Sequence, residues 1–121
     1  MEISIDQKNG SKAAVIASDT VIIHTVDDAL DVMASVRYTA DCDNMVLRKE
    51  HLSEDFFELK TGLAGSILQK YTNYKMRIAI VGEFGRYNSK SLNDFIYECN
   101  QGDSVFFTKT EAEALEKLHR S

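Results

Sequence analysis

Residues 76–82 have the sequence Met-Arg-Ile-Ala-Ile-Val-Gly, and this stretch decides the fold. The four residues from Ile78 to Val81 are all apolar, so exposing either side of the segment to water is unfavourable. Such a run is typical of a central strand in a parallel sheet, where helices cover both faces. We therefore expect this strand in the middle of a layered sheet, with the loop 82–86 at its carboxyl end.

Shorter apolar runs on both sides of this strand predict further strands. They lie around Ile3 and Ile5 and at 13–17, 21–23, 45–47 and 105–107. The turn signal Asn-Gly-Ser at 9–11 indicates an antiparallel hairpin between the first strands. Residues 13–17 and 21–23 form either two strands or one strand that is broken by a turn.

Helical patterns alternate with these strands. The predicted helices run from Thr25 to Thr39, from Thr61 onward, from Ser89 to Asn100 and from Thr110 to His119. Thr25 and Thr110 begin capping boxes, because an acidic residue follows each of them at the third position. The alternation favours a mostly parallel sheet with right-handed crossovers. We therefore predict a single α/β domain, residues 1–121, with a mixed sheet of four to six strands and about four helices.

The composition is that of an ordinary globular domain. With 44% hydrophobic and 27% charged residues, a chain of 121 residues can bury one core without help from a metal or a disulfide. The net charge of −5 argues against binding to nucleic acid or to an anionic membrane surface. Cys42 and Cys99 match no metal-ligand spacing, which favours reduced thiols. The first six residues lack the basic and apolar regions of a signal peptide, so we expect a cytoplasmic protein.

Parts of the chain resemble the STAS domain (sulfate transporter and anti-sigma-factor antagonist). These are 61–71, which begins Thr-Gly-Leu, the strand 78–82, and the closing units 105–107 and 111–115. In that family a Ser-Gly-Leu step opens the second helix. The resemblance implies a STAS-like layered fold and a regulatory role. Anti-sigma-factor antagonists carry Asp-Ser before the phosphorylated residue, whereas this chain has Leu-Lys at 59–60, so the resemblance assigns neither a phosphorylation site nor a kinase partner.

Nearly the whole chain also resembles a family of small bacterial proteins of unknown function. The shared segments include 54–57, 61–68 and 94–100. This second resemblance implies a family membership but no activity.

A candidate site is expected beyond the carboxyl ends of the strands, at the topological switch point where ligands of open parallel sheets bind. Three segments should meet there, and their residues are Arg48, Lys49 and His51, then Thr61 and Gly62, then Arg86 and Tyr87. A helix amino terminus offers free N–H groups to an anion, and the cations would add positive charge. The alternative is structural: Thr61 caps its helix, and Arg86 is a solvated loop cation.

Phe56 and Phe57 add a second feature to this segment. One ring is expected to cover the sheet while the other lines a pocket or a partner surface. Alternatively, a tight bend in the chain buries both rings.

Catalysis finds little support in the sequence. The three histidines, His24, His51 and His119, lie in unrelated contexts, and His51 is expected at the surface rather than in a metal site. We therefore predict no catalytic residue, no metal and no cofactor.

Two functions remain open. The first is a non-enzymatic regulatory module that binds a protein partner through the second helix and the loop before it. The second is a domain that binds a small molecule or anion at the helix start near Thr61. A homodimer that pairs through an exposed edge strand near Ile3 is compatible with either function.

Overall fold

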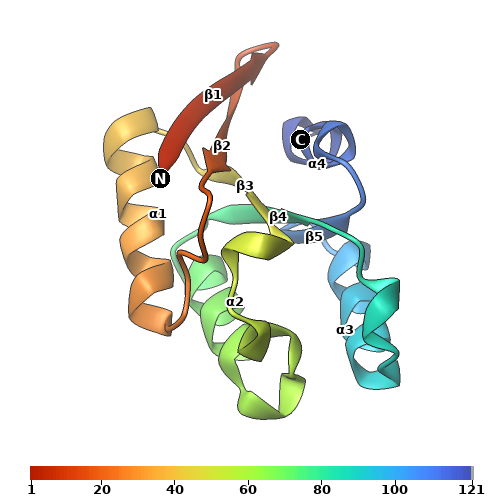
Figure 1. Ribbon diagram of the computed structural model, residues 1–121. Coiled ribbons are helices and arrows are strands. Elements are labelled where there is room, and N and C mark those ends of the chain that lie inside the picture. The colour runs from red at the N-terminus through yellow and green to blue at the C-terminus, as the bar shows by residue number, and fades with distance from the viewer. Residues whose placement is uncertain (121) are drawn as a thin grey trace.

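One five-stranded sheet organises the chain, and the computed structural model describes residues 1–120 (Figure 1). The strands are β1 (Glu2–Lys8), β2 (Ser11–Ala17), β3 (Asn44–Arg48), β4 (Arg77–Val81) and β5 (Val105–Thr108). They lie side by side in sequence order; β1 pairs antiparallel with β2, and β2 to β5 are parallel. The predicted α/β class and the mixed, mostly parallel sheet are confirmed.

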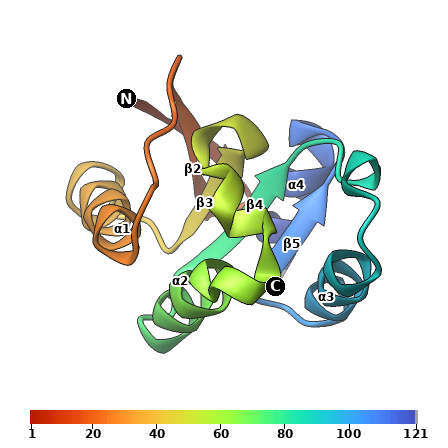
Figure 2. The same ribbon diagram turned by 60° about the horizontal axis from the view of Figure 1, so that its bottom comes forward.

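Helices cover both faces of the sheet, and they divide three to one. The helices are α1 (Val26–Ala40), α2 (Leu63–Asn73), α3 (Lys90–Gln101) and α4 (Glu111–His119). Figures 1 and 2 show α1, α2 and α3 on one face and α4 on the opposite face. The three crossovers each move one strand position in the same direction, so crossovers of the usual right-handed sense place α1, α2 and α3 on one face. The helix α4 follows the last strand and covers the other face.

β4 is buried on both sides, as its apolar run predicts. Ile78 and Ile80 belong to the core between the sheet and α1 to α3. Ala79 and Val81 point the other way and pack in a smaller cluster with Leu118 of α4. The alternation follows from the period of two along a strand, and it fixes the register of the whole sheet.

The predicted topological switch point is wrong. Among residues 1–120 the strand order runs from β1 to β5 without a reversal, so no crevice opens between crossovers that lead in opposite directions. The carboxyl ends of β3 and β4 nevertheless lie together, because these two strands pair in parallel over their full length.

Three of the four helix starts agree with the sequence. Thr25, Ser89 and Thr110 stand at the N-cap positions of α1, α3 and α4, and each side-chain oxygen accepts a hydrogen bond from the N–H three residues later at 3.1–3.2 Å. These caps define where the helices begin.

The predicted start of α2 at Thr61 is wrong. The helix begins at Leu63, and Gly62 takes the N-cap position with a φ of +80°. A positive φ suits glycine, so the chain turns here and Thr61 remains in the preceding 3₁₀ turn, Leu59–Thr61. Thr61 still assists the helix, because its Oγ1 accepts a hydrogen bond from the Leu63 N–H at 3.2 Å.

The first part of the chain resolves the alternatives left open for the early strands. Asn9 and Gly10 both have positive φ, 52° and 83°, which is the conformation of a tight hairpin turn between β1 and β2. Residues 21–23 add no further strand, since Ile23 makes only an isolated parallel bridge to Leu52.

Candidate functional site

Lys49 lies at the centre of the predicted site, but its side chain is buried. Its Nζ lies 3.7 Å from Oε1 of Glu54 and above the rings of Tyr87 and Phe57, at 5.0 and 5.7 Å from their centroids. A Cβ at Gly82 would stand only 2.7 Å from Cβ of Lys49, so glycine allows the close approach. The Lys49 side chain is therefore part of the packing, in contact with the rings of Phe57 and Tyr87, and is not free to bind a ligand.

The aromatic residues of this region pack against one another. Phe56 and Phe57 are both buried, with ring centroids 5.0 Å apart in an edge-to-face arrangement. Phe57 also stacks on Tyr87 at 5.0 Å and contacts Phe84 at 5.9 Å. We call the set Lys49, Glu54, Phe56, Phe57, Phe84 and Tyr87 the rim cluster. The expectation that one phenylalanine lines an open pocket is wrong, and the tight bend that buries both is correct.

Tyr87 closes the rim cluster with a hydrogen bond. Its hydroxyl donates to Oε2 of Glu54 at 3.0 Å. Burial raises the pKa of Tyr87 above its ordinary value, which keeps the hydroxyl protonated as a donor. The Glu54 carboxylate thus forms an ion pair with Lys49 and accepts a hydrogen bond from Tyr87.

Arg48 and His51 do not join the rim cluster. The Arg48 guanidinium lies 3.4 Å from Oε1 of Glu111, at the start of α4 on the other face of the sheet. His51 is buried, so its expected surface position is wrong; its Nδ1 accepts a hydrogen bond from the Arg48 N–H at 3.0 Å. Burial lowers the pKa of His51, so the neutral imidazole is favoured.

Of the predicted site residues, Thr61, Gly62 and Arg86 are exposed, and so is Arg48. The Thr61 hydroxyl lies 2.9 Å from two backbone carbonyl oxygens, those of Asp55 and Glu58. It thereby connects the turn Glu54–Phe57 to the start of α2. The structure therefore splits the predicted site into a packed interior and an exposed edge.

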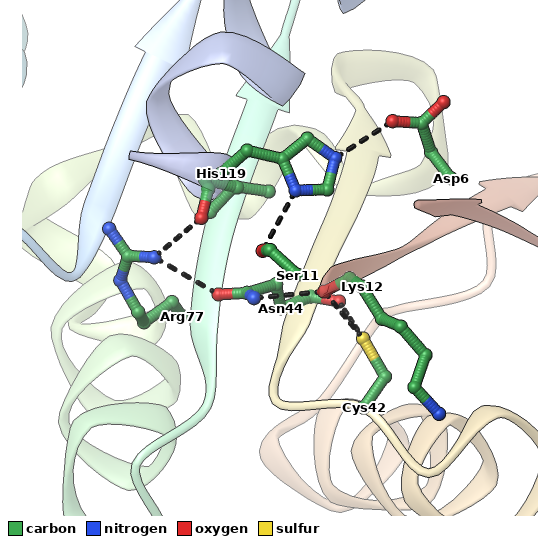
Figure 3. A network of polar contacts seen from close by, with 8 residues as sticks. Asp6, Ser11, Lys12, Cys42, Asn44, Arg77 and His119 are labelled. Carbon is green, nitrogen blue, oxygen red and sulfur yellow. Dashed lines mark hydrogen bonds and ion pairs between the residues drawn. The ribbon is translucent and has the colours of Figure 1, made fainter. Parts of the chain in front are cut away.

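A polar network occupies the opposite end of the sheet, where the parallel strands begin (Figure 3). Arg77 donates to Oδ1 of Asn44 at 3.2 Å and to the carbonyls of Leu118 and Asp103 at 2.8 Å each. Asn44 in turn donates to the Lys12 carbonyl at 2.9 Å, which also accepts from the buried thiol of Cys42. These contacts join three neighbouring strands to the last turn of α4.

His119 completes this amino-end network between two side chains of the hairpin. Its Nδ1 lies 2.8 Å from Oγ of Ser11, and its Nε2 lies 2.8 Å from Oδ2 of Asp6. Only 6% of the His119 side chain is exposed. The expectation that the histidines lie in unrelated contexts is therefore wrong for His119, which is in contact with a hydroxyl and a carboxylate.

Sequence spacing could not reveal this contact, because Ser11 and Asp6 lie 108 and 113 positions from His119. One signal was available. In the observed hairpin register Asp6 pairs with Ala13, and Ser11 precedes Ala13 by two residues, so it lies on the same face. Ala13 packs against α4, so the hairpin pattern directs both polar side chains toward that helix.

A surface depression of about 640 Å³ adjoins the network. Its lining includes Lys8, Ser11, Asn44, Arg77, His119 and Arg120. A second depression of about 560 Å³ reaches His119 from the side of Asp6 and Leu115. Ser11 thus borders a space that a small molecule could enter.

Comparison with known proteins identifies the family alone. Residues 8–118 match the family described as Domain of unknown function (DUF4180). The chain belongs to this family. Ser11 lies inside the matched region, whereas Asp6 lies two residues before its start and His119 directly after its end. No curated protein and no solved structure matches the chain. None of the helices within residues 1–120 has both the length and the apolar character needed to cross a membrane.

Proposed function

We propose that this domain is a regulatory module that binds a protein partner through the exposed edge before α2. We call this edge the docking rim, and it consists of Asp55, Glu58, Lys60 and Thr61. The observation that carries the proposal is the position of Thr61, which is exposed while its hydroxyl is held by the carbonyls of Asp55 and Glu58. The resemblance of 61–71 to the second helix of anti-sigma-factor antagonists supports the same location.

The packing beneath the docking rim favours recognition. Phe56 and Phe57 are buried directly under it, and Tyr87 stacks on Phe57. A surface that is already fixed loses little conformational entropy when a partner binds. The rim cluster therefore has a role in this proposal as the rigid support of the docking rim rather than as a ligand pocket.

Thr61 also offers a means of control. Any group attached to its Oγ1 would remove the hydrogen that it donates to the Asp55 and Glu58 carbonyls. A negative charge there would also add to the two carboxylates of the docking rim, those of Asp55 and Glu58. Such a change would alter both the shape and the charge of the surface that the partner contacts.

The test compares two glutamate substitutions near opposite ends of α2, one just before the helix and one in its last turn. Thr61→Glu changes the docking rim, whereas Thr72→Glu adds the same charge at an exposed position near the other end of α2. Tagged wild-type protein and Thr72→Glu should retain one stoichiometric partner from a lysate of the source organism, and Thr61→Glu should lose it. Circular dichroism melts verify that all three proteins are folded.

Equal retention of the partner by both glutamate variants would contradict the docking rim. Recovery of no stoichiometric partner by the wild-type protein, across conditions and after crosslinking, would contradict the regulatory function.

The alternative function is a small-molecule or anion site at the start of α2. Gly62 supports it, because this N-cap has no side chain of its own to accept from the first N–H groups of the helix, of which the Leu63 N–H is already bonded to Oγ1 of Thr61. Two of its three expected cations are engaged elsewhere, since Arg48 pairs with Glu111 and Lys49 with Glu54. The alternative predicts a rise in melting temperature with phosphate that is lost in Arg86→Ala. An equal rise in both proteins would exclude it.

A further inference from the structure

Ser11, His119 and Asp6 have the connectivity of an activated serine. An ionised carboxylate can only accept hydrogen bonds, so Asp6 fixes the proton of a neutral His119 ring on Nε2. The lone pair of Nδ1 then points at Ser11, whose hydroxyl must donate across the 2.8 Å contact. A serine that donates to an imidazole lone pair is polarised for attack, which is the arrangement general-base catalysis requires.

The fold holds the three residues in fixed positions. Asp6 lies on β1, Ser11 is the first residue of β2, and His119 is the last residue of α4. The hairpin register places Asp6 and Ser11 on the face that α4 covers. Arg77 fixes the end of α4 by donating to the Leu118 carbonyl. Preorganised groups of this kind need little rearrangement during a reaction.

The surroundings of Ser11 indicate the charge of a substrate. Ser11 borders the depression of about 640 Å³. The charged residues in its lining are four cations and one carboxylate: Lys8, Lys75, Arg77, Arg120 and Asp43. Arg120 pairs with Glu116, but within residues 1–120 no ion pair joins Lys8 or Arg77 to a carboxylate. This excess of positive charge beside a nucleophile favours a negatively charged substrate.

We propose that Ser11 is the nucleophile of a second, catalytic site that hydrolyses carboxylic esters of anionic acids. His119 is the general base, and Asp6 is a positioning residue that acts through His119. The imidazole is used in the opposite sense to that of the serine proteases, in which Nε2 faces the serine. The proton transfers are the same with the two nitrogens exchanged.

The reaction balances with water as the only co-substrate. Ser11 Oγ attacks the ester carbonyl as its proton moves to Nδ1 of His119, and a C–O bond forms. The tetrahedral intermediate collapses, the bond to the alcohol oxygen breaks, and His119 returns the proton to the leaving alcohol. Water then repeats the two steps and releases the acid from Ser11, which regains its hydroxyl.

The first test uses the unmodified protein and a fluorophosphonate probe. Attack by Ser11 Oγ forms an O–P bond and expels fluoride, so intact mass and peptide mapping should place one adduct on Ser11. His119→Asn should label roughly 100-fold more slowly. Ser4→Ala, which changes an exposed serine of the same hairpin, should label like wild type. No adduct on Ser11, or equal rates in wild type and His119→Asn, would overturn the nucleophile.

A second variant separates activation from simple exposure. In Ser11→Cys the paired imidazole should lower the thiol pKa, so iodoacetamide should alkylate Cys at this position with a pH midpoint below about 8.5, the value of a free thiol. Ser4→Cys on the same hairpin supplies the reference midpoint. Identical midpoints at the two positions would show that His119 only packs beside Ser11, and would overturn the proposal.

The third measurement concerns the class of substrate. The kcat/KM for a nitrophenyl ester of a dicarboxylic acid, which keeps one free carboxylate, should exceed that for the neutral acetate ester by about tenfold. Lys8→Met should reduce this preference. Equal kcat/KM values for the two esters in the wild-type protein would overturn the anionic substrate class.

Discussion

The two ends of the parallel strands differ in how they use their polar residues. At the carboxyl end, the ammonium group of Lys49 lies against aromatic rings and forms an ion pair with Glu54. At the amino end, Arg77 and His119 bond to neighbouring strands and also line open depressions. Residue type alone therefore does not locate a site. A cation after a strand, such as Lys49, can be part of the packing, whereas a histidine far away in the sequence, such as His119, can belong to a polar network.

The strongest way to break this comparison is to remove an aromatic ring from the rim cluster. Phe57→Ala deletes a buried ring that contacts three others, so it should lower the free energy of unfolding by about 3–5 kcal/mol in urea titrations. Tyr97→Ala removes an aromatic ring that is 64% exposed, and it should change stability by less than about 0.5 kcal/mol. Similar values for the two variants would show that the carboxyl end is not a packed cluster.

For the amino end we expect a smaller loss in the free energy of unfolding. Arg77→Met removes the donor of three hydrogen bonds and leaves the carbonyls of Leu118 and Asp103 without that partner. Hydrogen bonds from a charged group predict a loss of about 2–3 kcal/mol in the same titrations. Arg120→Met is the matched control, because Arg120 is exposed at the same end and its ion pair with Glu116 is solvated. It should change stability by less than about 0.5 kcal/mol.

Equal losses in Arg77→Met and Arg120→Met would mean that the amino-end network is only a surface feature. The amino-end network would then contribute nothing to stability beyond that of a solvated ion pair.

The hairpin that carries Asp6 and Ser11 allows a test with opposite signs. Gly10 has a φ of +83°, so Gly10→Ala should destabilise the protein by about 1–2 kcal/mol. Gly65 lies within α2 and has open space around its Cβ position, so Gly65→Ala should stabilise it by about 0.5–1 kcal/mol. Thermal melts of the two variants should shift in opposite directions, and a shift of the same sign would contradict the assigned turn.

Local signals predicted the elements of the fold better than they predicted the site. The run at 78–81 and the caps at Thr25 and Thr110 depend on neighbouring residues, and the structure agrees with them. The start of α2 failed because a cap pattern does not show that Gly62 adopts a positive φ. The strand order also failed as a guide to the site, because composition does not tell in which direction each crossover moves.

The contacts between distant residues were beyond the reach of spacing. Lys49 meets Tyr87, and His119 meets Asp6, only after the sheet has formed. The hydrophobic pattern fixes which face of a strand is buried, but it does not select which polar side chains meet across that face. Part of the candidate site predicted at the end of β3 therefore lies in the interior, and the contacts of His119 with Ser11 and Asp6 at the other end were missed.

The smallest expected effect concerns His51 at the carboxyl end, whose burial makes the free energy of unfolding depend on pH. Burial lowers its pKa in the folded state below the ordinary value of 6.5. Above pH 6.5 both states are neutral and the contribution of His51 to stability is fully present. As the pH falls from 6.5 through the lowered pKa, the unfolded chain binds a proton that the folded chain does not, so the free energy of unfolding decreases.

His51→Asn removes this titration, and its amide oxygen can still accept the hydrogen bond from the Arg48 N–H. The stability gap between wild type and His51→Asn, from urea titrations between pH 7.5 and pH 5, should therefore narrow as the pH falls. Leu52→Ala changes a buried neighbour that has no titratable group and keeps His51, so the difference in stability between this variant and wild type should stay constant. A constant gap for both variants would mean that His51 takes up its proton equally well in the folded protein. The carboxyl end would then admit solvent, and its contrast with the amino end would disappear.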